Sequence, residues 1–245
     1  MGHKYIKALI KFSKEDEFQK DLLNGKLFFR SVKGVRSVND PFDSYGSTAK
    51  TDFASIRVLY APDSFRPITC FYAVVVDDES DFVYLKFFEE QLEKIKRDFG
   101  EHVTVIKDVP RFIEQVKKAK PCIWYGCCDY TDDDIPIIPI FNKRIALSDE
   151  KEYRLLVDGF VFAHDVDGKN LTEDFGGGLH TNYYKDFYVL DRMLFVDIGN
   201  ISEISETCTL KQLAEGIKFP VMFDKEKNTP KNLTNLKEYK KKYLV

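Results

Sequence analysis

The chain has 245 residues, of which 44% are hydrophobic and 14% aromatic, so it carries enough apolar side chain to build a substantial core. Its 37 Lys+Arg and 40 Asp+Glu give a formal net charge of −3, which excludes a strong overall field that would attract nucleic acid or an anionic membrane. Neither an apolar leader nor a run of about 18 apolar residues occurs. We therefore expect a cytoplasmic protein with no membrane span.

Cysteine usage is typical of a reducing compartment. The five cysteines form no C-x-x-C pair and have no neighbouring histidine at zinc-ligand spacing. Cys127 and Cys128 are adjacent, which suits neither a disulfide framework nor a structural metal. Free thiols and the absence of a metal site are therefore expected.

The N-terminal part predicts a strand, a helix and a second strand. Residues 5–12 and 26–32 are short runs rich in β-branched and aromatic side chains, as in strands. Between them, Ser13 is expected to cap a helix whose first turn is acidic and which Gly25 ends.

A segment rich in turn-forming residues follows. Residues 33–51 have the density of Gly, Asn, Asp, Pro and Ser that is typical of an ordered loop. Strands are predicted at residues 56–60 and 68–76. The second is an almost unbroken apolar run, as expected of a strand covered on both faces.

Helical spacing returns in the middle of the chain. Apolar residues recur every three or four positions from 82 to 99, which predicts a helix closed by Gly100. We then expect a strand at 103–106, a short helix opened by Pro110, and a strand beginning at 122–125.

The second half is more often interrupted by turn formers. An acidic loop at 129–134 precedes the apolar stretch 135–141, whose prolines exclude a central strand. Strand character returns at 152–157. The remaining predicted elements are a strand at 160–162, a glycine-rich loop at 165–178, late strands within 187–198, a helix at 210–217 and a polar, lysine-rich, partly helical surface segment from about residue 224.

This order of elements predicts an α+β fold, with a mixed, mostly antiparallel sheet and flanking helices. No internal repeat or low-complexity tract divides the chain. We therefore expect a single domain over residues 1–245.

The strongest chemical candidate is the charged segment around Glu152. Strand alternation places Glu150, Glu152 and Arg154 on one face, with Lys151 and Tyr153 on the other. A pair of carboxylates beside a guanidinium is a candidate active site. The alternative is an exposed edge strand whose charges pair with a neighbour such as Lys143 or Arg144, and residue types alone favour it.

A second candidate lies in the loop Asn39-Asp40-Pro41-Phe42-Asp43. Its side-chain carbonyls can bond nearby backbone amides and hold the loop around a ligand. The alternative is an Asx-turn followed by a corner fixed by proline, which residue types again favour.

Several passages together resemble an uncharacterised family of small bacterial and phage proteins. The matching passages are LLNGKLFF (22–29), NDPFD (39–43), RDFGEHVTVIKDVPRFIEQV (97–116), IWYG (123–126), NKRIALSDEKEYRLLV (142–157) and DIGNISEIS (197–205). They are spread over most of the chain.

The opening strand and helix, the LLxGxL motif and the late E-x-E-x-R strand are also similar to those of ADP-ribosyltransferase-like toxins. This resemblance implies an effector in phage defence or a toxin system that uses NAD as a substrate. It assigns the ribose-orienting carboxylate to Glu152 or Glu150. The other cofactor-binding positions that it implies are Lys11 or Phe12 near the nicotinamide, Arg30 or Arg36 at the pyrophosphate, and Asn39, Asp40, Phe42, Tyr45 and Arg154 along the pocket.

Two other functions remain open on the sequence. One is a non-enzymatic binding module for a phage or host protein, or for a small signal molecule such as a nucleotide. The other is nucleic-acid binding through the lysine-rich C-terminal segment.

Overall fold

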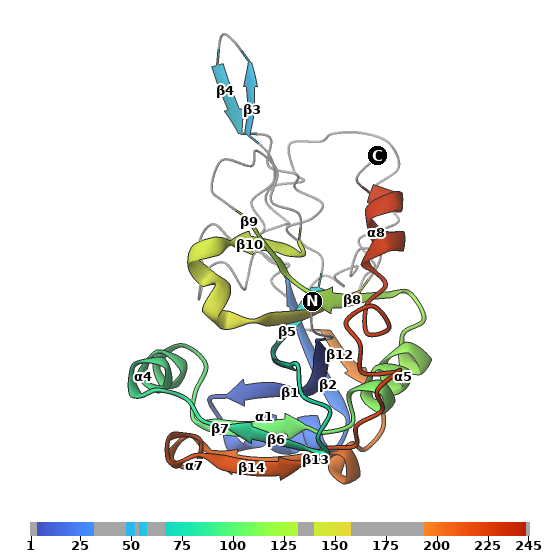
Figure 1. Ribbon diagram of the computed structural model, residues 1–245. Coiled ribbons are helices and arrows are strands. Elements are labelled where there is room, and N and C mark those ends of the chain that lie inside the picture. The colour runs from blue at the N-terminus through green and yellow to red at the C-terminus, as the bar shows by residue number, and fades with distance from the viewer. Residues whose placement is uncertain are drawn as a thin grey trace, which may run out of the picture.

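The computed structural model describes residues 4–31, 48–51, 54–57, 67–131, 140–157 and 194–243. Helices and a large antiparallel sheet are both present (Figure 1), which confirms the predicted α+β class. Within these ranges no helix is long and apolar enough to cross a membrane.

The main sheet contains eight strands, all of which pair antiparallel. They are β1 (Tyr5–Ser13), β2 (Lys26–Ser31), β5 (Pro67–Val76), β7 (His102–Ile106), β8 (Ile123–Cys127), β11 (Glu152–Val157), β12 (Leu194–Asp197) and β13 (Ser205–Thr209). A parallel pair lies outside this sheet, between β9 (Asp129–Thr131) and β10 (Asn142–Arg144).

Strand β5 holds the sheet together and is also where the sheet splits. One edge of β5 pairs with β11. The other edge is shared, because β1 pairs with residues 72–76 and β2 pairs only with Pro67 and Ile68. In the described part of the chain, Thr69, Cys70 and Phe71 therefore have no strand partner on that edge. From this gap the arm β1–β7–β13 and the arm β2–β12 diverge.

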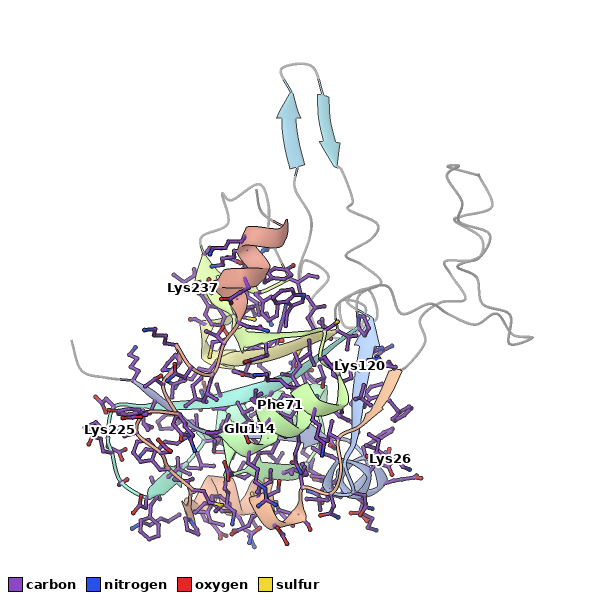
Figure 2. The ribbon with its side chains drawn as sticks, turned by 90° about the vertical axis from the view of Figure 1, so that its right-hand side faces the viewer. Lys26, Phe71, Glu114, Lys120, Lys225 and Lys237 are labelled. Carbon is purple, nitrogen blue, oxygen red and sulfur yellow. The ribbon has the colours of Figure 1, made fainter. Side chains whose placement is uncertain are left out.

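The two faces of the sheet are covered by different elements. Neighbouring residues Leu9 and Ile10 of β1 belong to two separate apolar clusters, as strand alternation requires. Helix α5 (Val109–Ala119) packs on the Leu9 face, where its Phe112 contacts Phe71 of β5 with ring centroids 5.5 Å apart, and Figure 2 labels Phe71 and the exposed Glu114 of α5. The Ile10 face is covered by α4 (Glu89–Asp98), α7 (Leu210–Glu215) and the hairpin of β6 (Phe82–Leu85) with β14 (Ile217–Pro220).

Helix α1 (Asp16–Leu23) links the two arms. It connects β1 to β2, and Gln19 donates a hydrogen bond of 2.8 Å to the backbone carbonyl of Val103 in β7. Its N-cap is Glu15, without a side-chain capping bond. The prediction that Ser13 caps this helix is wrong, because Ser13 is the last paired residue of β1.

The C-terminal segment is less peripheral than the sequence suggested. Leu236 and Tyr239 of α8 (Leu236–Tyr243) are buried with Phe141 in a third cluster. Asn228 is fully buried, and its amide group donates to the Ile6 carbonyl at 2.8 Å. The expectation of a surface segment is therefore wrong for these residues, although the lysines between them are exposed.

The remaining differences concern element boundaries. The predicted helix at 82–99 is a strand followed by a shorter helix, because Phe82, Val83, Tyr84 and Leu85 alternate between exposed and buried positions. Strand β9 lies within the predicted acidic loop. A hairpin of β3 (Thr48–Thr51) and β4 (Ala54–Arg57) occupies part of the predicted loop and of the strand predicted at 56–60.

Candidate ligand-binding site at the split of the sheet

A cavity of about 530 Å³ opens where the two arms of the sheet diverge. Register places Phe28, Arg30, Cys70, Tyr72 and Glu152 on one face of the sheet, and all five line the cavity. Its other walls come from the end of β1, from α1 and α4, and from the segment between β10 and β11. Lys26, labelled in Figure 2, also lines it.

The structure brings together most of the described candidate residues. Lys11, Phe12, Arg30, Glu150 and Glu152 all line this cavity, although they come from three separate stretches of the chain. Arg154 is not among the lining residues but bonds directly to Glu152. The candidates outside the described residues are Arg36, Asn39, Asp40, Phe42 and Tyr45.

Lys11 reaches into the gap in strand pairing. Its ammonium donates to Thr69 Oγ1 at 3.0 Å and to the Cys70 carbonyl at 2.8 Å, and lies 5.1 Å from the centre of the Phe71 ring. It thus supplies hydrogen bonds where β5 lacks a strand partner. Burial lowers the pKa of Lys11, and the negative charge of Glu152 acts in the opposite direction.

Glu152 is the centre of a buried group of charges. Arg154 Nε donates to its Oε1 at 2.7 Å, Arg154 Nη2 to its Oε2 at 3.1 Å, and Lys143 Nζ lies 2.8 Å from Oε2. Burial would raise the pKa of this carboxyl, but Arg154 and Lys143 outweigh it and hold the pKa below its usual range. The carboxylate is therefore ionised and both of its oxygens are already bonded.

Glu150 occupies a more open position than expected from strand alternation. Strand β11 begins at Glu152, and Glu150 ends the 3₁₀ helix η1 (Ile145–Glu150), separated by Lys151 with a φ of 40°. The prediction that Glu150 belongs to the strand is therefore wrong. The two glutamates still meet through Lys143, and Lys94 of α4 lies 3.3 Å from Glu150 Oε1.

Both sequence interpretations of this segment describe part of the arrangement. The charges pair with Lys143, as the alternative predicted. The exposed edge strand that it assumed is wrong, because β11 is buried throughout and lies between β5 and β8. The pairing also takes place at the wall of a cavity rather than in bulk solvent.

Aromatic side chains form two groups along the cavity. Phe87 contacts Phe12 and Tyr72, with ring centroids 6.3 and 5.2 Å apart. Phe28 lies between Phe18 and Phe195, with centroid distances of 6.4 and 5.4 Å, and the two outer rings are about half exposed. Such walls can hold a flat ring by stacking or edge contact.

Sequence reasoning missed several of the lining residues. Tyr72 and Cys70 were read only as part of an apolar strand, and Lys94 only as part of a polar helix face. Nothing local in the sequence places α4 against the segment before β11. Nor does the sequence distinguish Phe18 and Phe195, which are about half exposed at the cavity, from aromatic residues of the core.

Among the described residues no group of three or more His, Cys, Asp or Glu side chains could hold a metal ion. The five cysteines are free, and burial raises the pKa of the Cys70 thiol in the cavity.

No protein-family model, curated protein or solved structure matches this chain.

Proposed function

We propose that this cavity binds NAD and that the protein transfers its ADP-ribosyl group to a target, as an effector in phage defence or a toxin system. The observation that carries the proposal is that the candidate residues meet at one cavity. The resemblance implies roles for Lys11, Phe12, Arg30, Glu150 and Glu152, and these residues line one cavity from three separate stretches of the chain.

The size and walls of the cavity suit a nucleotide. Its volume of about 530 Å³ lies within the range of small-molecule sites. Flat rings can pack against the aromatic groups, while Arg30 and the exposed Lys14 provide positive charge for phosphate oxygens. The ring cluster around Phe87 lies next to the two carboxylates and is the natural place for the ring that leaves.

The chemistry requires one reachable carboxylate. As the bond from ribose C1 to nicotinamide breaks, the ring departs with the electron pair, and the sugar gains positive charge that a carboxylate stabilises. The target nucleophile then bonds to C1 and loses its proton. The Glu150 side chain is 22% exposed and that of Glu152 is 8% exposed. We assign the ribose contact to Glu150, with Glu152 holding Lys143 in place.

Labelled NAD tests this proposal directly. The purified chain is incubated with labelled NAD and cell extract, and NAD binding is measured by calorimetry. We expect binding below millimolar concentration and label transfer that Glu150→Gln reduces by about 10²-fold, as for loss of one stabilising contact. Glu203→Gln is the matched control, because Glu203 is exposed and does not line the cavity. Absence of both binding and transfer at millimolar NAD contradicts the proposal.

A non-enzymatic ligand-binding module is the second candidate. It is favoured by the pairing of both carboxylates with Lys and Arg side chains, since a saturated carboxylate is a poor partner for a reacting group. In that case Glu150→Gln leaves biological activity intact, whereas filling the cavity abolishes it. Glu150→Gln therefore separates the two functions, while a variant that narrows the cavity from its aromatic wall, such as Phe195→Trp, is expected to abolish both.

A further inference from the structure

The lysines of β1 differ sharply in their partners. Lys7 is fully buried and forms an ion pair with Asp78 at 2.5 Å. Lys11, four residues along the same strand, bonds only to a hydroxyl and a backbone carbonyl, and no described carboxylate lies within ion-pair distance of it. The other lysines around the cavity include Lys26, Lys94 and Lys143, and each of these is paired with an acidic side chain.

The hydrogen-bond partners of Lys11 match a neutral amine. An uncharged amine has two N–H donors and one lone pair, and the two acceptors, Thr69 Oγ1 and the Cys70 carbonyl, take both donors. The Phe71 ring lies 5.1 Å from the amine nitrogen and by itself favours the charged form, whereas the lack of a described carboxylate within ion-pair distance favours the neutral one.

Burial also favours that neutral form, because the ammonium loses its hydration in the gap of the sheet. Desolvated lysines in apolar pockets are the ones that act as nucleophiles toward carbonyl compounds. The amine lines an open cavity rather than being sealed in the core, so a small molecule can reach it.

We propose that Lys11 is a nucleophilic amine that forms a reversible imine with a small aldehyde or ketone entering the cavity. The amine nitrogen bonds to the carbonyl carbon as the C=O π bond opens, and an amine proton moves to the oxygen. That oxygen leaves as water after taking a second proton from solvent, and the nitrogen's remaining electron pair completes the C=N bond. Addition of water reverses the step, and nothing is oxidised or reduced.

The cavity best fits a carbonyl compound that has a flat ring and a negatively charged group. The aromatic walls provide ring contacts, and Lys14 and Arg30 lie along the same cavity. This reactivity does not depend on NAD. It uses the same cavity, so bound NAD is expected to slow it.

Imine trapping tests the inference. The whole chain is treated with pyridoxal 5′-phosphate, a flat aldehyde with a phosphate group, then with borohydride, which converts an imine to a stable secondary amine. Peptide mass spectrometry locates the label. Exposure alone predicts that Lys14 and Lys26 react first, because both are more exposed than Lys11. We expect the reverse, with Lys11 labelled at least several-fold faster than either exposed lysine, because desolvated lysines are the reactive ones.

Two variants serve as a matched pair. Lys11→Gln removes the amine and is expected to abolish the fast labelling, while Lys118→Arg, at an exposed lysine that does not line the cavity, leaves it unchanged. Label spread over exposed lysines, with Lys11 unmodified in the unaltered chain, overturns the inference whether or not the variants fold. Because this readout contains no NAD, its failure is distinct from failure of NAD binding.

Discussion

At the scale of single residues, the main desolvation cost comes from the charges that are buried around Glu152. Arg154 and Lys143 are almost completely buried, and Glu152 is the carboxylate between them. Desolvation of three charges is expensive, and it is offset only while every partner remains in place. The cluster therefore contributes more to defining the local structure than to net stability.

Removing the central charge should have a large effect. Glu152→Gln leaves Arg154 and Lys143 without their shared counter-charge, and we expect the free energy of unfolding to fall by about 3–5 kcal/mol. Glu150→Gln should cost about 1 kcal/mol or less, because Glu150 is partly exposed and Lys143 keeps Glu152. Urea unfolding of both variants measures the difference. Equal losses would show that Glu152 is not the centre of the cluster.

Because the pKa of Glu152 is lowered in the folded state, the stability of the protein should depend on pH. The folded state holds the pKa of Glu152 below the unfolded value, so its contribution is complete above the unfolded pKa of about 4.3 and is lost as the pH falls toward the folded pKa. In this range the unfolded chain binds the additional proton, with a slope of up to about 1.4 kcal/mol per pH unit. Asp78, whose pKa is lowered to about 2 mainly by hydrogen bonding to Lys7, acts in the same direction.

Unfolding measured from pH 5 to pH 2 should therefore show a steeper loss of stability for the unaltered chain than for Glu152→Gln. Parallel curves for the two proteins would mean that Glu152 has similar pKa values folded and unfolded.

Sequence alternation predicted part of this cluster. It placed Glu152 and Arg154 on one face, and they are on one face because β11 is regular from Glu152 onward. It failed for Glu150, because Lys151 adopts a positive φ that alternation cannot anticipate in a residue other than glycine.

Between secondary-structure elements, the clearest constraint is the turn that leads from α1 into β2. Gly25 has a φ of 91°, and its carbonyl accepts a hydrogen bond of 2.8 Å from the amide of Ile198, just beyond β12. A Cβ built on Gly25 would lie 2.2 Å from the carbonyl oxygen of Gly199. The close approach fastens the start of β2 to the end of its partner strand.

Gly25→Ala and Gly199→Ala form a matched pair of substitutions. Both glycines have positive φ, but a Cβ on Gly199 meets nothing within 4 Å. We expect about 1–2 kcal/mol for Gly199→Ala from its backbone conformation alone, and a clearly larger loss for Gly25→Ala because the backbone of Gly199 must also move. Thermal unfolding compares them, and similar losses would argue against the steric contact.

Element prediction worked where local pattern and packing agreed. The predicted strands at 5–12 and 68–76 became β1 and β5 because their apolar runs are buried on both faces. The helix predicted at 82–99 failed in its first part because Phe82–Leu85 pairs with β14, more than a hundred residues further along the chain. Periodicity within a short window contains no information about such a partner.

The arrangement of the whole molecule could not be read from the sequence for the same reason. The cavity depends on β1 and β2 sharing one edge of β5, where three residues have no strand partner in the described part of the chain. No motif in the sequence indicates this register. The residue types of the site were predictable, whereas their convergence was not.

The C-terminal segment offers a test of how far the fold depends on distant contacts. Asn228 is fully buried, and its carbonyl accepts from the Ile6 amide while its side-chain amide donates to the Ile6 carbonyl, both at 2.8 Å. Its side-chain oxygen accepts from the Asp224 amide at 2.9 Å. One side chain therefore ties residues 222 positions apart in the sequence.

Asn228→Ala should lower the free energy of unfolding by about 2–4 kcal/mol, since it leaves buried polar groups of β1 and of the turn at Asp224 without partners. Asn232→Ala is the control, because Asn232 is exposed and its amide bonds only within the same segment. Hydrogen exchange of the Ile6 amide adds a local readout. If the segment is integral to the fold, Asn228→Ala accelerates exchange across β1, whereas a peripheral segment would leave that strand protected in both variants.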